Sequence, residues 1–345
     1  MKRVFLLALA LMPLLSRATD FRGAQFMGFT NFPALKEGRI TSEEIKSEVN
    51  WDELVVSWNL RGNGILTIEA RLIQPGATSK WYTLGLWSKQ SRRSVNGQDD
   101  EFAKVDTDTL KAQQPGAKMQ FRVGLDGATA KDLKFVGLAF RDSKAKFESM
   151  EPNRIAWGKS VDVASRSQLD HPEGAKIWCS PTSTSMALDF WGRKLQREEL
   201  GMTVPDAAKA VYDSVYKGTG NWPFNTAFAG SFEGIRSYVS RFSDVSELED
   251  WIAAGIPVVT SVSYNRLKGQ NRGGSGHLIV CVGFAENGDI VVNDPGTKLS
   301  NVRRTFPRDT FRQAWADSGN TVYLIYPEAW TIPPARFGHW ETRAQ

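Results

Sequence analysis

The sequence WCSPTSTSMALDFWG, residues 178–192, predicts a cysteine at the amino-terminal end of a helix. A proline in the first turn needs no backbone donor, and nearby Ser and Thr side chains can bind the free N–H groups, so we expect the helix to begin at about Ser180. We expect Gly192 to end it. One face of the helix should be buried, and its members by spacing are Ser183, Ala187, Phe190 and Trp191.

Cys179 is the chemically interesting residue of this stretch. The amino-terminal end of a helix carries a partial positive charge, which favours the thiolate and lowers the thiol pKa. The thiolate is the form that attacks carbonyl groups, so the position is typical of a nucleophile. The alternative is structural: Cys179 could be a small buried residue, or could pair with Cys281, which is the second of only two cysteines in the chain.

Residues 1–18 have the pattern of a secretory signal peptide, with Lys2 and Arg3, an apolar run over 4–15 and a small-x-small site that ends at Ala18. We therefore expect a secreted or periplasmic protein, cleaved near Ala18.

No later segment has the eighteen or so uninterrupted apolar residues that a membrane span requires. Cleavage removes three basic residues and no acid, so the formal charge of +5 falls to +2. With no cluster of Lys or Arg among aromatics, we expect no nucleic-acid partner.

Roughly 327 residues would remain after cleavage, which predicts two domains. Residues 19–150 contain short runs of alternating apolar residues between turn signals, and five of these runs are predicted strands: 54–60, 66–72, 81–88, 119–125 and 133–140. Such a pattern predicts an all-β antiparallel sandwich. Its tryptophans, Trp51, Trp58, Trp81 and Trp87, could form a binding platform or belong to the core.

Residues 151–160 are predicted as a linker, 161–330 as an α+β domain and 331–345 as a tail. Helical spacing predicts helices over 204–215 and 232–242. A third helix should start with a capping box of Ser246 and Glu249 and end at Gly255, before a strand at 257–263.

A β-hairpin is predicted from 277 to 296, with the turn at Asn287-Gly288. In this hairpin His277 and Asp294 lie on the same face of the sheet, and Asn293 lies on the other. A two-residue turn, however, leaves His277 and Asp294 too far apart for a hydrogen bond at about 3.3 Å per residue. Their contact requires a wider loop or slippage by an even number of residues.

A thiol needs a base, and the base needs a third group that orients it, which Cys179, His277 and Asp294 can supply. We expect no metal, because no two of the His and Cys residues have the spacing of zinc ligands. We expect no cofactor either: the loop Gly269–Gly276 precedes His277 but has neither the Lys nor the helix of a phosphate-binding loop.

Segment 160–326 resembles the papain-like cysteine peptidases, specifically those similar to the bacteriocin leader-processing peptidases, family thirty-nine of the cysteine peptidases. The motifs are WCSPTSTSMALDFWG, GTGNWPFNTAFAG (218–230), LEDWIAAGIPVVTSVS (248–263), SGHLIVCVGF (275–284) and IVVNDPG (290–296). The resemblance implies Cys179 as nucleophile, His277 as general base and acid, and Asp294 as the residue that orients His277. It also implies that Gln168 stabilises the oxyanion together with the cysteine N–H, although its separation of eleven residues from Cys179 exceeds the spacing in papain. Ser180 stands where the family usually has Gly.

The sequence as a whole therefore predicts an α+β papain-like cysteine peptidase domain preceded by an all-β antiparallel sandwich domain. The expected function is hydrolysis of amide or peptide bonds in a peptide or protein substrate, through an acyl-enzyme on Cys179. Two alternatives remain open: a non-catalytic module that binds peptides or surfaces, and a cell-wall peptide hydrolase or acyl transferase with the same three side chains. We expect the sandwich to position the substrate and to take no part in the chemistry.

Overall fold

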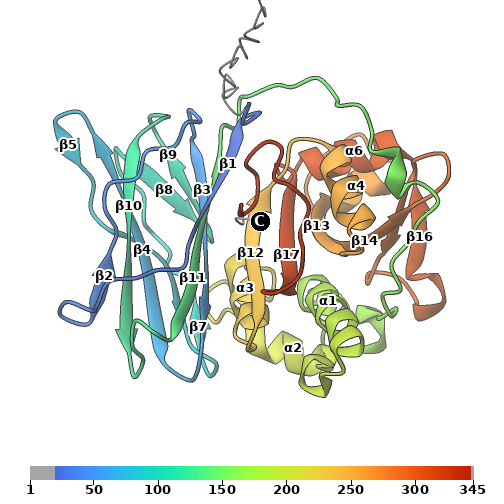
Figure 1. Cartoon of the computed structure of the whole chain (residues 1–345), viewed down its shortest axis with the longest axis horizontal. Helices are drawn as coiled ribbons and strands as arrows, with labels where there is room; N and C mark the ends of the chain where they lie inside the picture. Colours follow the sequence, from blue (N-terminus) through green and yellow to red (C-terminus); the bar gives the residue numbers. More distant parts are fainter. Residues whose placement is uncertain (1–19, 343–345) are drawn as a thin grey trace, which may run out of the picture.

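The computed structural model describes residues 20–342, so the predicted signal peptide lies outside the described residues. Two bodies lie side by side, an all-β body and an α+β body (Figure 1). Within residues 20–342, no helix is both long and apolar enough to cross a bilayer.

The amino-terminal body consists of two antiparallel sheets, as predicted. One has the order β1-β11-β3-β9-β8, with β1 Ala24–Phe29, β3 Glu53–Leu60, β8 Ala103–Asp106, β9 Thr109–Ala112 and β11 Leu133–Arg141. The other has the order β2-β10-β4-β6-β7, with β2 Arg39–Thr41, β4 Ile65–Gln74, β6 Tyr82–Trp87, β7 Arg92–Arg93 and β10 Lys118–Asp126, and β5 Ala77–Thr78 pairs with β4. Alternating apolar residues of both sheets meet in one core.

Three of the four tryptophans considered for a binding platform belong to the core instead. Trp51, Trp58 and Trp87 are fully buried. Trp81 lies outside the core and holds the guanidinium groups of Arg71 and Arg122 over its ring, 4.6 and 4.3 Å from the centroid. The four rings therefore do not form one platform.

The carboxy-terminal body has one six-stranded antiparallel sheet of order β12-β17-β13-β14-β15-β16. Its strands are β12 Ile235–Arg241, β13 Val258–Ser263, β14 Gly276–Phe284, β15 Ile290–Asn293, β16 Arg303–Phe306 and β17 Thr321–Pro327. Its helices are α1 Cys179–Leu195, α2 Val204–Val211, α3 Trp222–Gly230, α4 Val245–Ala253, α5 Tyr264–Leu267 and α6 Arg308–Ala316, with single 3₁₀ turns η1 Arg154–Ala156, η2 Gln168–Asp170, η3 Glu198–Leu200 and η4 Leu299–Asn301.

Helices α1 and α4 cover opposite faces of this sheet. Tyr323 of β17 hydrogen-bonds Ser180 of α1, whereas Tyr326, three residues later and so on the other face, packs against Trp251 of α4. The sheet is therefore covered on both sides. Helix α1 lies next to the first residues of β14, since Ser183 Oγ donates to the Leu278 carbonyl at 3.0 Å.

The predicted helix over 232–242 is wrong: residues 235–241 form strand β12. Every residue of β12 is buried, so both faces of the strand can carry apolar side chains. Ile235, Tyr238, Val239 and Phe242 then happen to match helical spacing, because burial on two faces removes the alternation that marks a strand.

The predicted helix ends are also corrected in part. Helix α1 continues through Gly192 to Leu195, because Gln196 adopts the left-handed conformation (φ 57°) that terminates it. Helix α2 ends at Val211, so Val215 lies outside it.

The capping box of α4 lies two residues before the predicted pair. Its members are Asp244 and Glu247, and Gly255 follows the helix end as expected. Glu249 instead accepts hydrogen bonds from Trp157 Nε1 and Arg308 Nη1. The predicted strand after this helix is confirmed as β13.

The two bodies are joined through strand β12, which lies at the edge of its sheet beside β3 (Figure 1). Asn59 of β3 donates through Nδ2 to the carbonyl of Ser237 at 2.7 Å and accepts from the N–H of Ser237 at 3.1 Å. Ser57 Oγ accepts from the N–H of Val239 at 2.9 Å. Side chains of β3 thus bind the backbone groups that an edge strand leaves open, and Phe224 of α3 enters the core of the sandwich.

The segment predicted as a tail packs onto both bodies as far as it is described, to residue 342. Trp340 and His339 are buried. Both ring nitrogens of His339 are engaged away from the predicted site: one bonds Glu247 Oε1 at 2.6 Å, and the other bonds the carbonyl of Phe21 at 2.8 Å.

Candidate active site

Cys179 lies at the amino-terminal end of α1, as the sequence predicts, and is its first residue, one position before the expected start at Ser180. The predicted side-chain cap is absent: Trp178 is the cap residue and makes no side-chain cap bond, and Thr182 Oγ1 donates backwards to the Trp178 carbonyl at 2.7 Å. The first N–H groups of the helix are therefore available at the thiol, and the N–H of Ser180 is one of the groups that lower the Cys179 pKa.

His277 and Asp294 are brought together by two separate one-residue shifts in the hairpin. Ala285 and Asp289 still pair beyond the two strands, so the turn that they close has three residues and not two. A bulge between Cys281 and Gly283 adds the second shift. Together they give the even slippage that the contact requires, and the turn is wider than the two residues that would have kept His277 and Asp294 apart.

The His277 Nε2 to Asp294 Oδ1 distance is 2.6 Å. Asp294 is fully buried and also accepts from the Gly296 N–H at 2.9 Å and from Arg304 Nη1 at 3.0 Å. Gly296 approaches the ring closely, because a Cβ there would lie 2.9 Å from His277 Cε1. The imidazole is thus fixed between a carboxylate and a backbone turn.

The thiol of Cys179 and the imidazole of His277 act on each other, and each changes the pKa of the other. Burial raises the pKa of Cys179, but the hydrogen bond and charge of His277, with the N–H groups of Leu278 and Ser180, outweigh it and lower the pKa overall. Burial lowers the pKa of His277, but bonds to Asp294 and Cys179 raise it to about 9. For Asp294, burial raises the pKa, and His277 and Arg304 hold it below its usual value. The three groups therefore favour thiolate, imidazolium and carboxylate.

Cys281 has no part in this arrangement. Both cysteines are free, so the alternative of a Cys179–Cys281 disulfide is wrong. Cys281 is buried in β14, and burial raises its pKa to about 12. Only Cys179 combines access with an activated thiol.

Asn293 lies on the opposite face from Asp294, as parity predicts. Its Nδ2 donates to the Val163 carbonyl at 3.1 Å, and its Oδ1 accepts from Arg303 Nε at 2.7 Å. It ties β15 to the segment that enters the domain and does not reach His277.

Gln168 lies in η2, next to the loop that follows Asp294, because its N–H donates to the Pro295 carbonyl at 3.0 Å. One hydrogen of its side-chain amide goes to the Ala175 carbonyl at 2.7 Å, in the loop before α1. Gln168 is thus held between the Cys179 and Asp294 segments.

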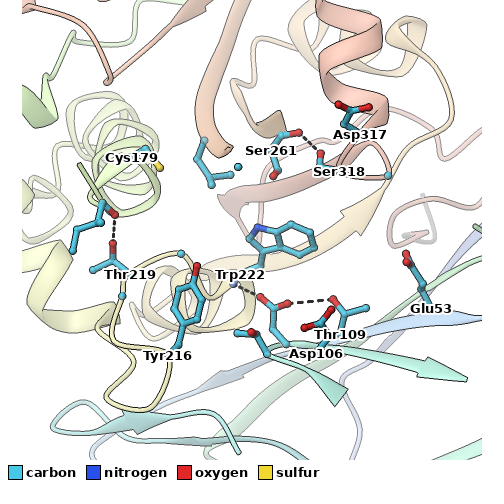
Figure 2. A pocket seen from close by; sticks show the side chains of 18 of the residues that line it. Glu53, Asp106, Thr109, Cys179, Tyr216, Thr219, Trp222, Ser261, Asp317 and Ser318 are labelled. Carbon is cyan, nitrogen blue, oxygen red and sulfur yellow. Dashed lines mark hydrogen bonds between the residues drawn. The ribbon is translucent and has the colours of Figure 1, made fainter. Parts of the chain in front are cut away.

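A cleft of about 630 Å³ opens at Cys179, between the two bodies. Figure 2 shows the sulfur directed into it, with Tyr216 and Trp222 at its base and Ser261 and Ser318 at its far side. The β8–β9 turn, residues 106–109, lines it from the amino-terminal body. Asp108 of this turn accepts from the N–H of Trp222 at 2.8 Å, and burial raises its pKa to about 6. The sandwich therefore forms one wall of the cleft.

Two residues at the site were not found from the sequence. Arg304 reaches Asp294 from β16, and the Tyr264 ring lies 4.6 Å from the His277 ring. The distance along the sequence from His277 to either residue predicts no contact. Arg304 comes near because β16 pairs with β15, and Tyr264 comes near because it follows β13 directly. Within residues 20–342, no group of three or more His, Cys, Asp or Glu residues is arranged to hold a metal ion.

Two family models match the chain, in agreement with the resemblance drawn from the motifs. Residues 160–323 match the Peptidase C39-like family, and residues 19–136 match the Peptidase C39 N-terminal domain. A solved structure, described as a C39-like peptidase from Bacillus anthracis, is 18% identical and covers 49% of this chain and 98% of its own, with a TM-score of 0.34. No curated protein matches the chain.

The order of the two matches agrees with the fold, an all-β body followed by an α+β body. Residues 160–323 belong to the Peptidase C39-like family, and the all-β part before them is a Peptidase C39 N-terminal domain.

Proposed function

We propose that the protein is a cysteine peptidase that hydrolyses amide bonds in peptides through an acyl-enzyme on Cys179. The observation that carries the proposal is a cysteine at the start of α1 whose pKa His277 lowers, with the His277 ring bonded to Asp294 at 2.6 Å and the thiol open to the cleft. These are the nucleophile, the base and the orienting group that acyl transfer needs.

In this mechanism the thiolate of Cys179 attacks the scissile carbonyl, and the His277 imidazolium donates its proton to the leaving amine. His277, then neutral, takes a proton from the water that hydrolyses the thioester, and the departing thiolate restores the ion pair. Asp294 keeps the ring oriented and stabilises its charged form.

The oxyanion would be held by the N–H of Cys179 and by Gln168. One hydrogen of Gln168 Nε2 is engaged with Ala175, and the other has no partner among the described residues. A donor that is fixed before the reaction stabilises the developing charge without reorganisation.

We also propose that the protein is exported, on the pattern of residues 1–18. Expression of the full chain in a bacterial host, followed by cell fractionation and amino-terminal sequencing, tests this. A mature protein that starts just after Ala18 outside the cytoplasm supports export, and an intact Met1 in the cytoplasm contradicts it.

The test of the peptidase proposal is incubation of the protein with a complex peptide library and identification of new termini by mass spectrometry. We expect cleavage by the native chain and none by Cys179→Ala. Binding of peptides without cleavage would favour a non-catalytic module, and transfer to an added amine in place of water would favour an acyl transferase.

A further inference from the structure

The cleft at Cys179 is lined by four acidic side chains, and each is already engaged. Glu53 accepts from Arg141 at 2.7 Å and lies 3.6 Å from Arg241. The other three are Asp106, which pairs with Lys111 at 2.9 Å, Asp317, which pairs with Arg266 at 2.7 Å, and Asp108, which caps the start of α3. The acids of the cleft therefore leave little free negative charge for a ligand.

Two basic side chains of the cleft differ from the rest. Lys176 and Lys217 line it, are exposed, and have no ion-pair or hydrogen-bond partner among the described residues. The other basic groups of the cleft, Lys111, Arg141 and Arg241, are held by the acids named above. The uncompensated charge of the cleft is thus positive.

Both lysines are held near the thiol by the backbone. Lys176 precedes Cys179 by three residues, and Lys217 is in a left-handed conformation (φ 56°) within the tight turn closed by Asp213 and Gly218. The two segments are tied together, since Thr219 Oγ1 donates to the Ile177 carbonyl at 2.5 Å, a bond drawn beside Cys179 in Figure 2. The two charges therefore belong to one side of the cleft.

We propose that this cleft selects peptides with a carboxylate close to the scissile bond, and that Lys176 and Lys217 bind that carboxylate. Tyr216 and Trp222 at the base of the cleft would support the rest of the peptide. Ammonium groups attract and position an anion in a cleft more strongly than on an open surface, because the low-dielectric walls concentrate the field. The inference rests on the proposed peptidase function and adds the substrate class.

The charge at the thiol can be measured without turnover, from the ratio of Cys179 labelling rates by anionic iodoacetate and neutral iodoacetamide. In the double variant Lys176→Gln/Lys217→Gln we expect this ratio to fall about fivefold at low ionic strength, and less at high salt. Lys46→Gln, an exposed lysine outside the cleft, is the matched control. An unchanged ratio in the double variant, or the same fall in the control, would overturn the proposal.

The ligand class is tested with two peptides that differ only in Glu or Gln residues. We expect the Glu peptide to slow iodoacetamide labelling of Cys179 at a lower concentration than the Gln peptide, and this preference to disappear in the double lysine variant. Equal protection by both peptides contradicts the inference. Protection by the Glu peptide without cleavage of any library peptide would support the acidic ligand class and contradict the peptidase proposal. Cleavage of library peptides without any preference for Glu would support the peptidase proposal and contradict the acidic ligand class.

Discussion

Replacing Asp294 by Asn should narrow the pH range in which the thiolate and imidazolium coexist. Asparagine keeps the size of the side chain and an oxygen for the Gly296 N–H, but removes the charge that faces His277. The imidazolium is then less stable, so the pKa of His277 falls, and the thiolate that it supports becomes harder to form, so the pKa of Cys179 rises.

The size of the effect follows from the pKa of His277. Its rise from 6.5 to about 9 corresponds to about 3 kcal/mol of preference for the charged ring. Asp294 and Cys179 share this preference, and the bond to Asp294 is the largest of the raising causes. Loss of roughly half would lower the pKa of His277 by about one unit and raise that of Cys179 by a similar amount.

The assay is the rate of Cys179 alkylation by iodoacetamide from pH 4 to 10, read by peptide mass spectrometry. In the native chain labelling should already be fast below the ordinary thiol pKa of about 8.5, and the midpoint should move up by about one unit in Asp294→Asn. Peptide cleavage, which needs the imidazolium as acid, should be lost above about pH 9 in the native chain and about one unit lower in the variant.

Asp289→Asn, which flanks the turn of the same hairpin, is the control, and it should leave the labelling profile unchanged. Asn293→Ala should reduce stability, because Arg303 and the Val163 carbonyl lose a buried partner, but it should not shift the profile. If Asp294→Asn labelled with the native profile while Asn293→Ala shifted it, the assignment of the third residue would be refuted.

Three further changes have distinct outcomes. Gln168→Ala should reduce peptide cleavage by about 10²-fold or more while iodoacetamide labels Cys179 at the native rate, and equal loss of both would mean a structural role instead. Gly296→Ala should place a methyl group against the His277 ring and lower cleavage severalfold, with a loss of unfolding free energy of about 1–3 kcal/mol, and native activity would show that the turn yields. Asn59→Ala should lower the free energy of unfolding by roughly 2–4 kcal/mol in urea titration, because the backbone of β12 loses both bonds, and a change below 0.5 kcal/mol would show that the interface does not depend on them.

The main features of the site could be predicted because they depend on local patterns. A proline and small polar residues after Cys179 indicate a helix start, and alternation along the hairpin places His277 and Asp294 on one face. The register could not be predicted, since it depends on one loop residue and one bulge that leave no clear mark in the sequence.

The contacts between the two bodies could not be predicted for a related reason. Asn59 and Ser57 lie in a strand with both faces buried, one against the sandwich core and one against β12. The same double burial made β12 resemble a helix. The sequence indicates which residues form each body, but it carries no signal that the β8–β9 turn lines the cleft at Cys179. The expectation that the sandwich only positions the substrate stays a prediction.

The central claim is that Cys179 becomes acylated by the substrate. Its most direct test is rapid acid quenching of the protein with a cleavable library peptide in H₂¹⁸O, followed by mass spectrometry of the Cys179 peptide and of the released carboxylate. We predict a transient thioester on Cys179 that carries the amino-terminal fragment of the substrate, and one ¹⁸O atom in the released product. Cleavage that proceeds without this adduct, or that persists in Cys179→Ala, would contradict the account.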